Sequence, residues 1–316
     1  MEYSVIIPTH NRPDLVVRAI RSVYAQTCPP LEVLVIDDAS QPPLELPEDL
    51  RDGRTRLIRH ERSVGGAAAR NSGLCEAAAS IVAFLDDDDE WMPAKMEIQL
   101  AWLNDNPRAA LVTCGHLRCE AGHEYLEVFT QRFVERYREY DNFFGSFSYL
   151  VIRQPRPPAY LDPALPALQD WDFALCLTRY SSFGVIEQPL VKYYAHDLPR
   201  ITNRPGNHLR GLRHCYLKHK LHISTDARRW LLGRVVFERS RCIAGRRKRI
   251  ARVLLSMALS APCRVPLIMK LRVMARRAAS IGISPRAVAT IRSTVIASWQ
   301  GLRTRLHGSR SSPATT

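Results

Sequence analysis

The chain has 316 residues, of which 46% are hydrophobic, enough for one large α/β domain and a smaller appended unit. Its first residues lack the basic start and apolar core of a secretory signal, and no uncharged apolar run of about 18 residues follows, so neither export nor a membrane-spanning helix is expected. Eight cysteines without a C-x-x-C pair predict reduced thiols and a cytoplasmic protein rather than a disulfide or zinc framework.

The net charge of +14 combines two opposite regions. Residues 201–316 carry 25 Lys and Arg against two acidic residues, whereas residues 1–200 carry 20 basic and 29 acidic residues. This asymmetry predicts a domain at 1–203 and a basic, mostly helical region at 204–316, whose end, 308–316, is expected to be disordered. The basic region is expected to meet an anionic membrane surface, or else to pack on the first domain with a solvated basic face. Nucleic acid is not expected, because no recognisable binding motif accompanies the charge.

The first elements predict a βαβ unit. Residues 3–7 are apolar and β-branched and stop at Pro8, which is typical of a buried strand. A helix follows with Asn11 as its cap, and it ends before the prolines at 29–30. Residues 31–36 form a second buried strand. Strand, helix and strand at this spacing predict parallel pairing.

Two further strands and two helices are predicted next. Short apolar runs at 56–59 and 81–85 predict strands, and residues 67–79 and 93–103 are expected to form helices. The runs at 31–36 and 81–85 each lead directly into aspartates. In an open α/β sheet ligands bind at the carboxyl ends of the strands, so this edge is the expected ligand site.

The last part of the first domain carries weaker patterns. Residues 170–180 predict a helix, and the apolar pairs at 185–186, 190–191 and 193–194 predict three short strands. Strands and helices thus continue to mix up to the composition change near residue 203, which favours an α/β domain.

The sharpest chemical signal is the run of four aspartates after the strand at 81–85, Asp86-Asp87-Asp88-Asp89. Four adjacent carboxylates repel one another, and each loses favourable hydration when it is buried. A divalent cation relieves that repulsion, and hard oxygen ligands suit Mg²⁺ or Mn²⁺. The alternative is a solvated acidic loop or helix start.

Two other segments carry groups suited to a nucleotide. Asp37 and Asp38, after the strand at 31–36, offer carboxylates that can accept hydrogen bonds from a base or a ribose, although a turn or a helix cap explains them equally well. Gly65 and Gly66 precede a helix that contains Arg70, so backbone amides and a guanidinium would suit a diphosphate. The segment does not match G-x-G-x-x-G, so a dinucleotide site is not supported.

Five segments in order resemble the motifs of family 2 glycosyltransferases, which have the GT-A fold. They are SVIIPTHNR at 4–12, VIDDAS at 35–40, GGAAARNSG at 65–73, FLDDDDEWMPAK at 84–95 and QDWDF at 169–173. The resemblance spans about residues 3–203 and implies a Rossmann-like nucleotide-diphospho-sugar transferase fold, a mixed sheet flanked by helices. Ser63 and Gln169 depart from the family, which often has Asn and Glu at these places.

The resemblance implies roles on the donor side. Asp38 should contact the nucleotide base, and Arg70 should lie near the diphosphate. Asp88 is implied as the principal metal ligand with Asp86 in support; His196 is a weaker metal candidate, for which an ordinary loop histidine is the other interpretation. The nucleotide and donor site is expected to contain Pro8, Thr9, Asn11, Asp38, Arg70, Asp86 and Asp87.

Asp170 is the catalytic base that the resemblance implies. An acceptor hydroxyl has a high pKa, so a positioned carboxylate must take its proton as attack proceeds. The leaving nucleoside diphosphate gains charge, which a metal stabilises. The family inverts the anomeric centre in one displacement, so no covalent nucleophile is needed. Without the resemblance, Asp170 is also explained as a helix N-cap; Asp172 is expected to be structural, and Trp91 to pack rather than stack on a sugar.

These observations predict a metal-dependent, inverting glycosyltransferase that uses Mn²⁺ or Mg²⁺. It would move a sugar from a nucleotide-diphosphate sugar to a hydroxyl of a saccharide or lipid-linked acceptor, in cell-surface polysaccharide or glycolipid biosynthesis. The basic region predicts peripheral attachment at the inner face of the cytoplasmic membrane. Two alternatives stay open: a metal-dependent nucleotidyl- or phosphotransferase, and a non-catalytic protein that binds anionic surfaces.

Overall fold

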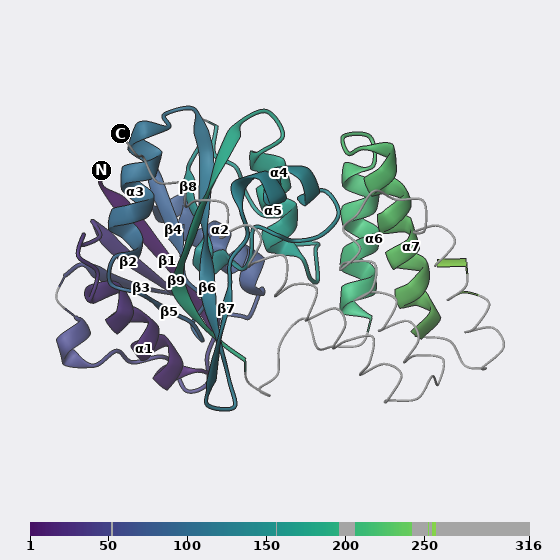
Figure 1. Cartoon of the computed structure of the whole chain (residues 1–316). Helices are drawn as coiled ribbons and strands as arrows, with labels where there is room; N and C mark the ends of the chain where they lie inside the picture. The colour runs from purple at the N-terminus through teal and green to yellow at the C-terminus, as the bar shows by residue number, and fades with distance from the viewer. Residues whose placement is uncertain (52, 156, 196–205, 242–251, 253–254, 257–316) are drawn as a thin grey trace, which may run out of the picture. The chain divides into compact units, whose positions relative to one another are not determined.

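The structure is a computed structural model that describes residues 1–51, 53–155, 157–195, 206–241, 252 and 255–256. The chain divides into two compact units, Met1–Asn203 and Arg204–Thr316. Figure 1 shows both, and each is described by itself.

The first unit alternates strands and helices in its first half and is richer in strands in its second. Its strands are β1 (Tyr3–Thr9), β2 (Glu32–Asp37), β3 (Thr55–Arg59), β4 (Ile81–Phe84), β5 (Glu90–Trp91), β6 (Ala109–Glu120), β7 (His123–Glu127), β8 (Val151–Arg153) and β9 (Ser182–Tyr194). Its helices are α1 (Pro13–Tyr24), α2 (Gly66–Glu76), α3 (Lys95–Asp105), α4 (Gln131–Tyr137) and α5 (Gln169–Leu177).

The strands form one mixed sheet in the order β3-β2-β1-β4-β8-β6-β9-β5, with β7 beside β6. β1 pairs in parallel with β2 and β4, and β2 pairs in parallel with β3. β8 is antiparallel to both β4 and β6, whereas β6 and β9 run parallel. The predicted βαβ start and the mixed α/β fold class are therefore confirmed.

Helices cover both faces of the sheet (Figure 1). Val5 and Ile7 of β1 belong to a buried cluster with residues of α1 and α3. Ile6 points the other way, toward α2, because successive side chains of a strand alternate between faces. A Cβ at Gly73 would lie 2.5 Å from Ile6 Cγ2, so the glycine lets α2 approach the sheet closely. Parallel pairing of β1 with both β2 and β4 places the carboxyl ends of the three strands side by side.

The prediction of three short strands at 185–186, 190–191 and 193–194 is wrong. These residues belong to one strand, β9, which pairs with β6 along most of its length. The register shifts where Gly115 meets Pro189, so the ladder contains an irregularity there. The polar residues at that irregularity interrupt the apolar pattern, although the backbone continues as one strand.

The prediction that Asn11 caps the first helix is also wrong. Arg12 is the residue before α1, and Asn11 has a left-handed backbone with φ 56°. Capping needs an extended backbone at the capping residue, whereas Asn tolerates the left-handed region. The side-chain oxygen of Asn11 instead accepts a hydrogen bond from the backbone N–H of Gln41 at 2.7 Å, which ties the loops after β1 and β2 together.

The second unit contains α6 (Asn207–His219) and α7 (Thr225–Arg241) within its described residues. Leu212, Cys215, Trp230 and Leu231 are buried in it. In the parts of the chain that the structure describes, none of the helices combines the length and the apolar character needed to cross a membrane. The predicted disordered end, 308–316, lies outside the described residues.

Candidate functional site

The carboxyl ends of three neighbouring strands meet at one edge of the sheet. β1 ends at Thr9, β2 ends at Asp37, and the acidic run follows β4. Thr9 and Asp37 are paired in register, and the Thr9 hydroxyl donates to Asp87 Oδ2 at 2.8 Å. Two of the predicted donor-site residues, Thr9 and Asp87, are thus in direct contact.

Asp87 and Asp88 share one cationic partner. Arg12 Nη1 lies 2.9 Å from Asp87 Oδ1 and 3.1 Å from Asp88 Oδ2. Burial raises the pKa of Asp87 to about 6; Arg12 opposes this rise and the Asp88 charge adds to it. Arg18 donates from Nη2 to the backbone oxygen of Asp88 at 2.7 Å. The middle of the acidic run is therefore held by arginines rather than solvated.

Asp86 pairs with Arg70. The Arg70 guanidinium also lies 4.1 Å from the ring centre of Phe147 and donates to the backbone oxygen of Gly66 at 3.1 Å. A Cβ at Gly66 would lie 2.9 Å from Arg70 Nη1, so this glycine leaves room for the guanidinium. The predicted diphosphate residue and one predicted metal ligand are thus neighbours.

Asp89 is fully buried, and its Oδ2 accepts a hydrogen bond from the Ser148 hydroxyl at 2.6 Å. The same hydroxyl accepts from the backbone N–H of Asp86 at 3.0 Å. The indole of Trp91 donates to the Ser148 backbone oxygen at 2.9 Å and carries the Lys95 ammonium 4.1 Å from its ring. Trp91 is buried, as expected for a packing residue, and Asp89 holds the turn in shape.

Asp38 accepts four hydrogen bonds from the segment that leads to α2. Its Oδ1 accepts from His60 Nδ1 and the Val64 N–H, both at 2.9 Å. Its Oδ2 accepts from the Ser63 hydroxyl at 2.7 Å and the Gly65 N–H at 2.9 Å. Burial alone would raise the pKa of Asp38, but these bonds hold it below its usual range. Asp38 therefore fixes the loop before α2, and its contact with a nucleotide base stays a prediction.

Asp37 does a different job from Asp38. It is fully buried, accepts from the Ser40 N–H at 2.9 Å, and pairs with Arg59. Burial would raise the pKa of Asp37, but its hydrogen bonds with Ser40, Leu44 and Arg59 lower it overall. These bonds close the turn after β2, so for this aspartate the turn interpretation is correct.

Asp170 lies in the first turn of α5 and accepts from the Trp171 N–H at 2.8 Å. The residue that precedes the helix is Leu168, with φ 66°, so the N-cap interpretation of Asp170 is wrong. Burial raises the pKa of Asp170 to about 6. The Trp171 N–H and Arg70 lower it, whereas the Asp86 charge raises it further. Asp170 therefore lies near enough to the Asp86–Arg70 pair for both charges to influence its pKa.

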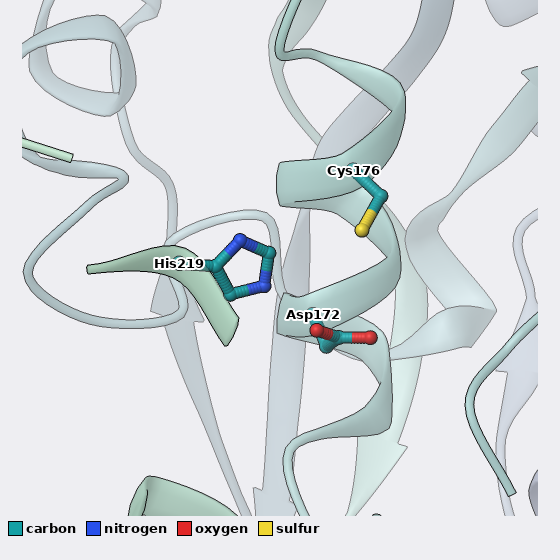
Figure 2. A group of neighbouring side chains, drawn as sticks. All are labelled: Asp172, Cys176 and His219. Atoms are coloured by element: carbon teal, nitrogen blue, oxygen red, sulfur yellow. The ribbon is translucent and has the colours of Figure 1, made fainter. Parts of the chain in front are cut away.

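Asp172 and Cys176 lie one turn apart on α5 and face the same side of it (Figure 2). Asp172 is buried, as expected for a structural residue, whereas Cys176 is exposed. His219, also labelled in Figure 2, belongs to α6 of the second unit. His196, the weaker metal candidate, lies outside the described residues.

The donor set fits a hard divalent cation. The side chains of Asp86, Asp87 and Asp88 supply carboxylate oxygens, which Mg²⁺ and Mn²⁺ prefer to nitrogen or sulfur. Asp87 Oδ1 and Asp88 Oδ2 already converge on one cationic nitrogen, that of Arg12. The geometry thus places two carboxylates around a point of positive charge.

Arg12 and Ser148 also belong to this site, although the sequence predicted no role for either of them. Arg12 ends the first motif, and a cation there could have been expected to answer the charge of Asp87 and Asp88. Ser148 carries no sequence signal, because it reaches the acidic run only through the fold. Pro8 lies within β1 beside Ile36, close to the predicted donor residues.

The chain matches the family described as glycosyl transferase family 2 over residues 4–154. The glycosyl transferase WcaA of Escherichia coli (strain K12), named for colanic acid biosynthesis, is 28% identical over 69% of this chain and 81% of its own length. WfgD of Escherichia coli, a UDP-Glc:alpha-D-GlcNAc-diphosphoundecaprenol beta-1,3-glucosyltransferase, is 36% identical over 33% of this chain and 41% of its own length.

Other relatives are much longer than the shared region. An uncharacterized glycosyltransferase of Rickettsia conorii is 38% identical over 39% of this chain, which spans only 20% of that protein. The crystal structure of S. aureus TarS in complex with UDP-GlcNAc is similar with a TM-score of 0.60 and 14% identity, covering 95% of this chain and 92% of that chain. This likeness supports the predicted GT-A fold. On the family match and the related sequences together, residues 4–154 of the chain form a glycosyl transferase family 2 domain.

Proposed function

We propose that the chain is a metal-dependent, inverting glycosyltransferase that moves a sugar from a nucleotide-diphosphate sugar to a hydroxyl acceptor. The observation that carries this proposal is the position of Asp170 in the first turn of α5, near enough to the Asp86–Arg70 pair for both charges to act on its carboxyl. A proton acceptor and a cationic anion-binding group thus share one edge of the sheet.

Asp170 is the base in this proposal. Its pKa of about 6 leaves it mostly ionised at neutral pH, yet makes it a stronger base than an ordinary aspartate. It would take the proton of the acceptor hydroxyl while that oxygen attacks the anomeric carbon. One base is sufficient for a single displacement, which inverts the configuration.

The leaving diphosphate is the second demand of the reaction. Arg70 is nearly buried, and Phe147 and Asp86 fix its guanidinium, so little ordering is needed when the diphosphate binds. A divalent cation held by Asp88 and Asp86 would supply electrophilic stabilisation of the charge that develops there. Pro8 and Thr9 end β1 and Asn11 lies in the loop that follows, and these residues would line the nucleotide pocket.

The biological setting is proposed from the relatives and from the charge distribution. WcaA is named for colanic acid biosynthesis, and the name of WfgD gives a diphosphoundecaprenol acceptor. We therefore assign this chain to cell-surface polysaccharide synthesis with a lipid-linked acceptor at the inner face of the cytoplasmic membrane. Residues 1–203 would carry catalysis, and the basic residues 204–316 would attach to anionic lipid.

The membrane part has its own test. Flotation of the full chain with vesicles containing anionic phospholipid should recover the protein at low salt and release it at high salt. Neutral vesicles serve as the control. Absence from the anionic vesicle fraction at low salt would refute attachment without affecting the catalytic proposal.

The catalytic proposal is tested by nucleoside-diphosphate release. The full chain is incubated with a panel of sugar nucleotides, Mn²⁺ or Mg²⁺, and a bacterial lipid extract as acceptor source. At least one donor should yield nucleoside diphosphate with wild type, and the Asp170→Asn variant should yield almost none. Release of pyrophosphate or phosphate instead would favour a nucleotidyl- or phosphotransferase, and no product with any donor would contradict the enzyme proposal.

A further inference from the structure

Arg12 contacts two neighbouring carboxylates of the acidic run. A single nitrogen of its guanidinium, Nη1, contacts Asp87 at 2.9 Å and Asp88 at 3.1 Å. The Arg12 side chain is 23% exposed, so its guanidinium borders solvent rather than being locked in the core. An arginine thus stands where two carboxylate oxygens converge.

Arg18, in the second turn of α1, is held differently. It donates to the backbone oxygen of Asp88 rather than to the carboxylate. Its guanidinium also pairs with Glu90 at 2.9 Å and lies 4.2 Å from the ring centre of Tyr194. Arg18 can therefore keep the backbone of the run in place whatever the Asp88 carboxylate binds.

We infer that Arg12 is an internal counter-ion that occupies the Asp87–Asp88 pair until a divalent cation takes Asp88 from it. The inference rests on the proposed metal role of Asp88 and goes beyond it, because it assigns a function to a residue outside the ligand set. Without Arg12, the adjacent carboxylates would repel each other in the metal-free protein. The positive charge of Arg12 offsets that repulsion, so a metal ion must compete with the arginine for Asp88.

Charge makes the two occupants compete. A divalent cation bound to the Asp88 carboxylate would bring a second positive charge beside the Arg12 guanidinium, which lies 3.1 Å from Asp88 Oδ2. The two cations would repel each other, so binding of the metal would weaken the contact with Arg12. The Thr9 hydroxyl stays on the far oxygen of Asp87, so the run keeps its shape while Arg12 withdraws.

The test is Mn²⁺ binding to the metal-free full chain, measured from the electron paramagnetic resonance signal of free Mn²⁺. The Arg12→Gln variant should bind Mn²⁺ roughly tenfold more tightly than wild type, because a charged competitor is gone. Arg12→Met is a second uncharged variant that keeps an apolar stem. Arg12→Lys keeps the charge and should stay close to wild type.

Arg21→Gln is the matched control. Arg21 lies on α1, the helix that follows Arg12, and pairs at 3.3 Å with Asp49, with both side chains 59% exposed. The control removes the same charge away from the acidic run and should leave the Mn²⁺ dissociation constant unchanged. Thermal unfolding gives a second readout: metal-free Arg12→Gln should unfold at a lower temperature than wild type, and Mn²⁺ should raise that temperature by more.

The outcomes separate the two proposals. If Asp88→Asn weakens Mn²⁺ binding but folded Arg12→Gln and Arg12→Met bind Mn²⁺ no more tightly than wild type, Arg12 is not a competitor and this inference is wrong, while the metal site stands. If Asp88→Asn binds Mn²⁺ as wild type does, the metal is not at Asp88, and the metal proposal fails together with this one.

Discussion

Two pairs of neighbouring aspartates lie at the carboxyl ends of parallel strands in this protein, and they are held in different ways. At the end of β2, Asp37 and Asp38 accept hydrogen bonds from the backbone N–H groups of Ser40, Val64 and Gly65, and Asp37 also pairs with Arg59. After β4, Asp87 and Asp88 share the guanidinium of Arg12. If a carboxylate that closes a loop moved away, the N–H donors of that loop would lose their partner at a high cost in free energy. A carboxylate that pairs with an arginine side chain can exchange its partner at a lower cost.

We therefore expect Asp37 and Asp38 to stabilise the fold, and Asp87 and Asp88 to exchange partners when a ligand binds. Substitution after β2 should lower stability first, and activity as a consequence. Substitution after β4, or at Asp170, should lower activity with little loss of stability. The predictions below test this division, beginning with the largest expected effect.

Asp170→Asn should reduce the turnover rate by about 10²–10⁴-fold, the usual contribution of a positioned general base. The same change should raise the unfolding temperature above pH 6. The pKa of Asp170 is raised to about 6, so its ionised form is less stable in the folded protein than in the unfolded chain. That cost is absent below the ordinary pKa of about 4, develops as the pH rises from about 4 to 6, and stays constant above the folded pKa.

The measurements for Asp170 are steady-state turnover and thermal unfolding from pH 4 to 8. Wild-type turnover should fall about tenfold per pH unit below 6, because the proton blocks the base. Asp14→Asn is the control, an exposed acid in the first turn of α1. A full rate in Asp170→Asn would remove the base from the mechanism.

Asp88→Asn should reduce turnover by about 10²–10³-fold at saturating donor and metal. The carboxamide keeps the size of the side chain, so the urea-unfolding free energy should change by less than about 1 kcal/mol. Asp49→Asn, which removes an exposed pair with Arg21, is the control for both measurements. A large loss of stability together with activity would place Asp88 with the structural aspartates and break the contrast.

The positions of these aspartates followed from local sequence, but their partners did not. Apolar runs ending in aspartates predicted β2 and β4, and parallel pairing of both strands with β1 brings their carboxyl ends to one edge of the sheet. The hydrogen bonds that Asp38 accepts depend on the conformation of the loop before α2, where Gly65 has φ +88°. Asp38 and this loop are far apart in sequence, so their contact could not be predicted from a local pattern.

Asp170 illustrates the same limit. Its motif predicted a catalytic role, whereas its raised pKa comes from burial and from Asp86, which lies on a different element of the fold. Ser148 joins the acidic run through two hydrogen bonds and had no sequence signal at all. Local patterns thus predicted the strand ends, and tertiary packing determined the electrostatics there.

Asp38→Asn should lower the free energy of unfolding by roughly 1–3 kcal/mol, since its amide group would face donors that need an acceptor. The pKa of Asp38 lies below its ordinary value, so its contribution is present above about pH 4 and is lost as the pH falls through the folded pKa. In urea unfolding, the difference in the free energy of unfolding between wild type and Asp38→Asn should be large at pH 7 and smaller at pH 3.5. If the stability at pH 7 is unchanged, Asp38 does not stabilise the fold, and its role would be in ligand binding alone.

The smallest effect is expected at Gly66, which touches only the donor side of the site. A methyl group there would lie 2.9 Å from Arg70 Nη1 and push the guanidinium away from Asp86. Because the obstacle is the end of a flexible side chain, Arg70 can shift by a few tenths of an ångström, and alanine favours the helix that begins at this residue by up to about 1 kcal/mol.

Gly66→Ala should therefore keep or slightly raise the unfolding temperature and increase the Michaelis constant for the sugar nucleotide by only about threefold to tenfold, equivalent to about 1 kcal/mol. Turnover at saturating donor should stay within about twofold, because a displaced Arg70 weakens donor binding before it affects proton transfer by Asp170. An unchanged Michaelis constant would mean that Arg70 does not bind the diphosphate, and the β4 side of the comparison would then rest on the acidic run alone.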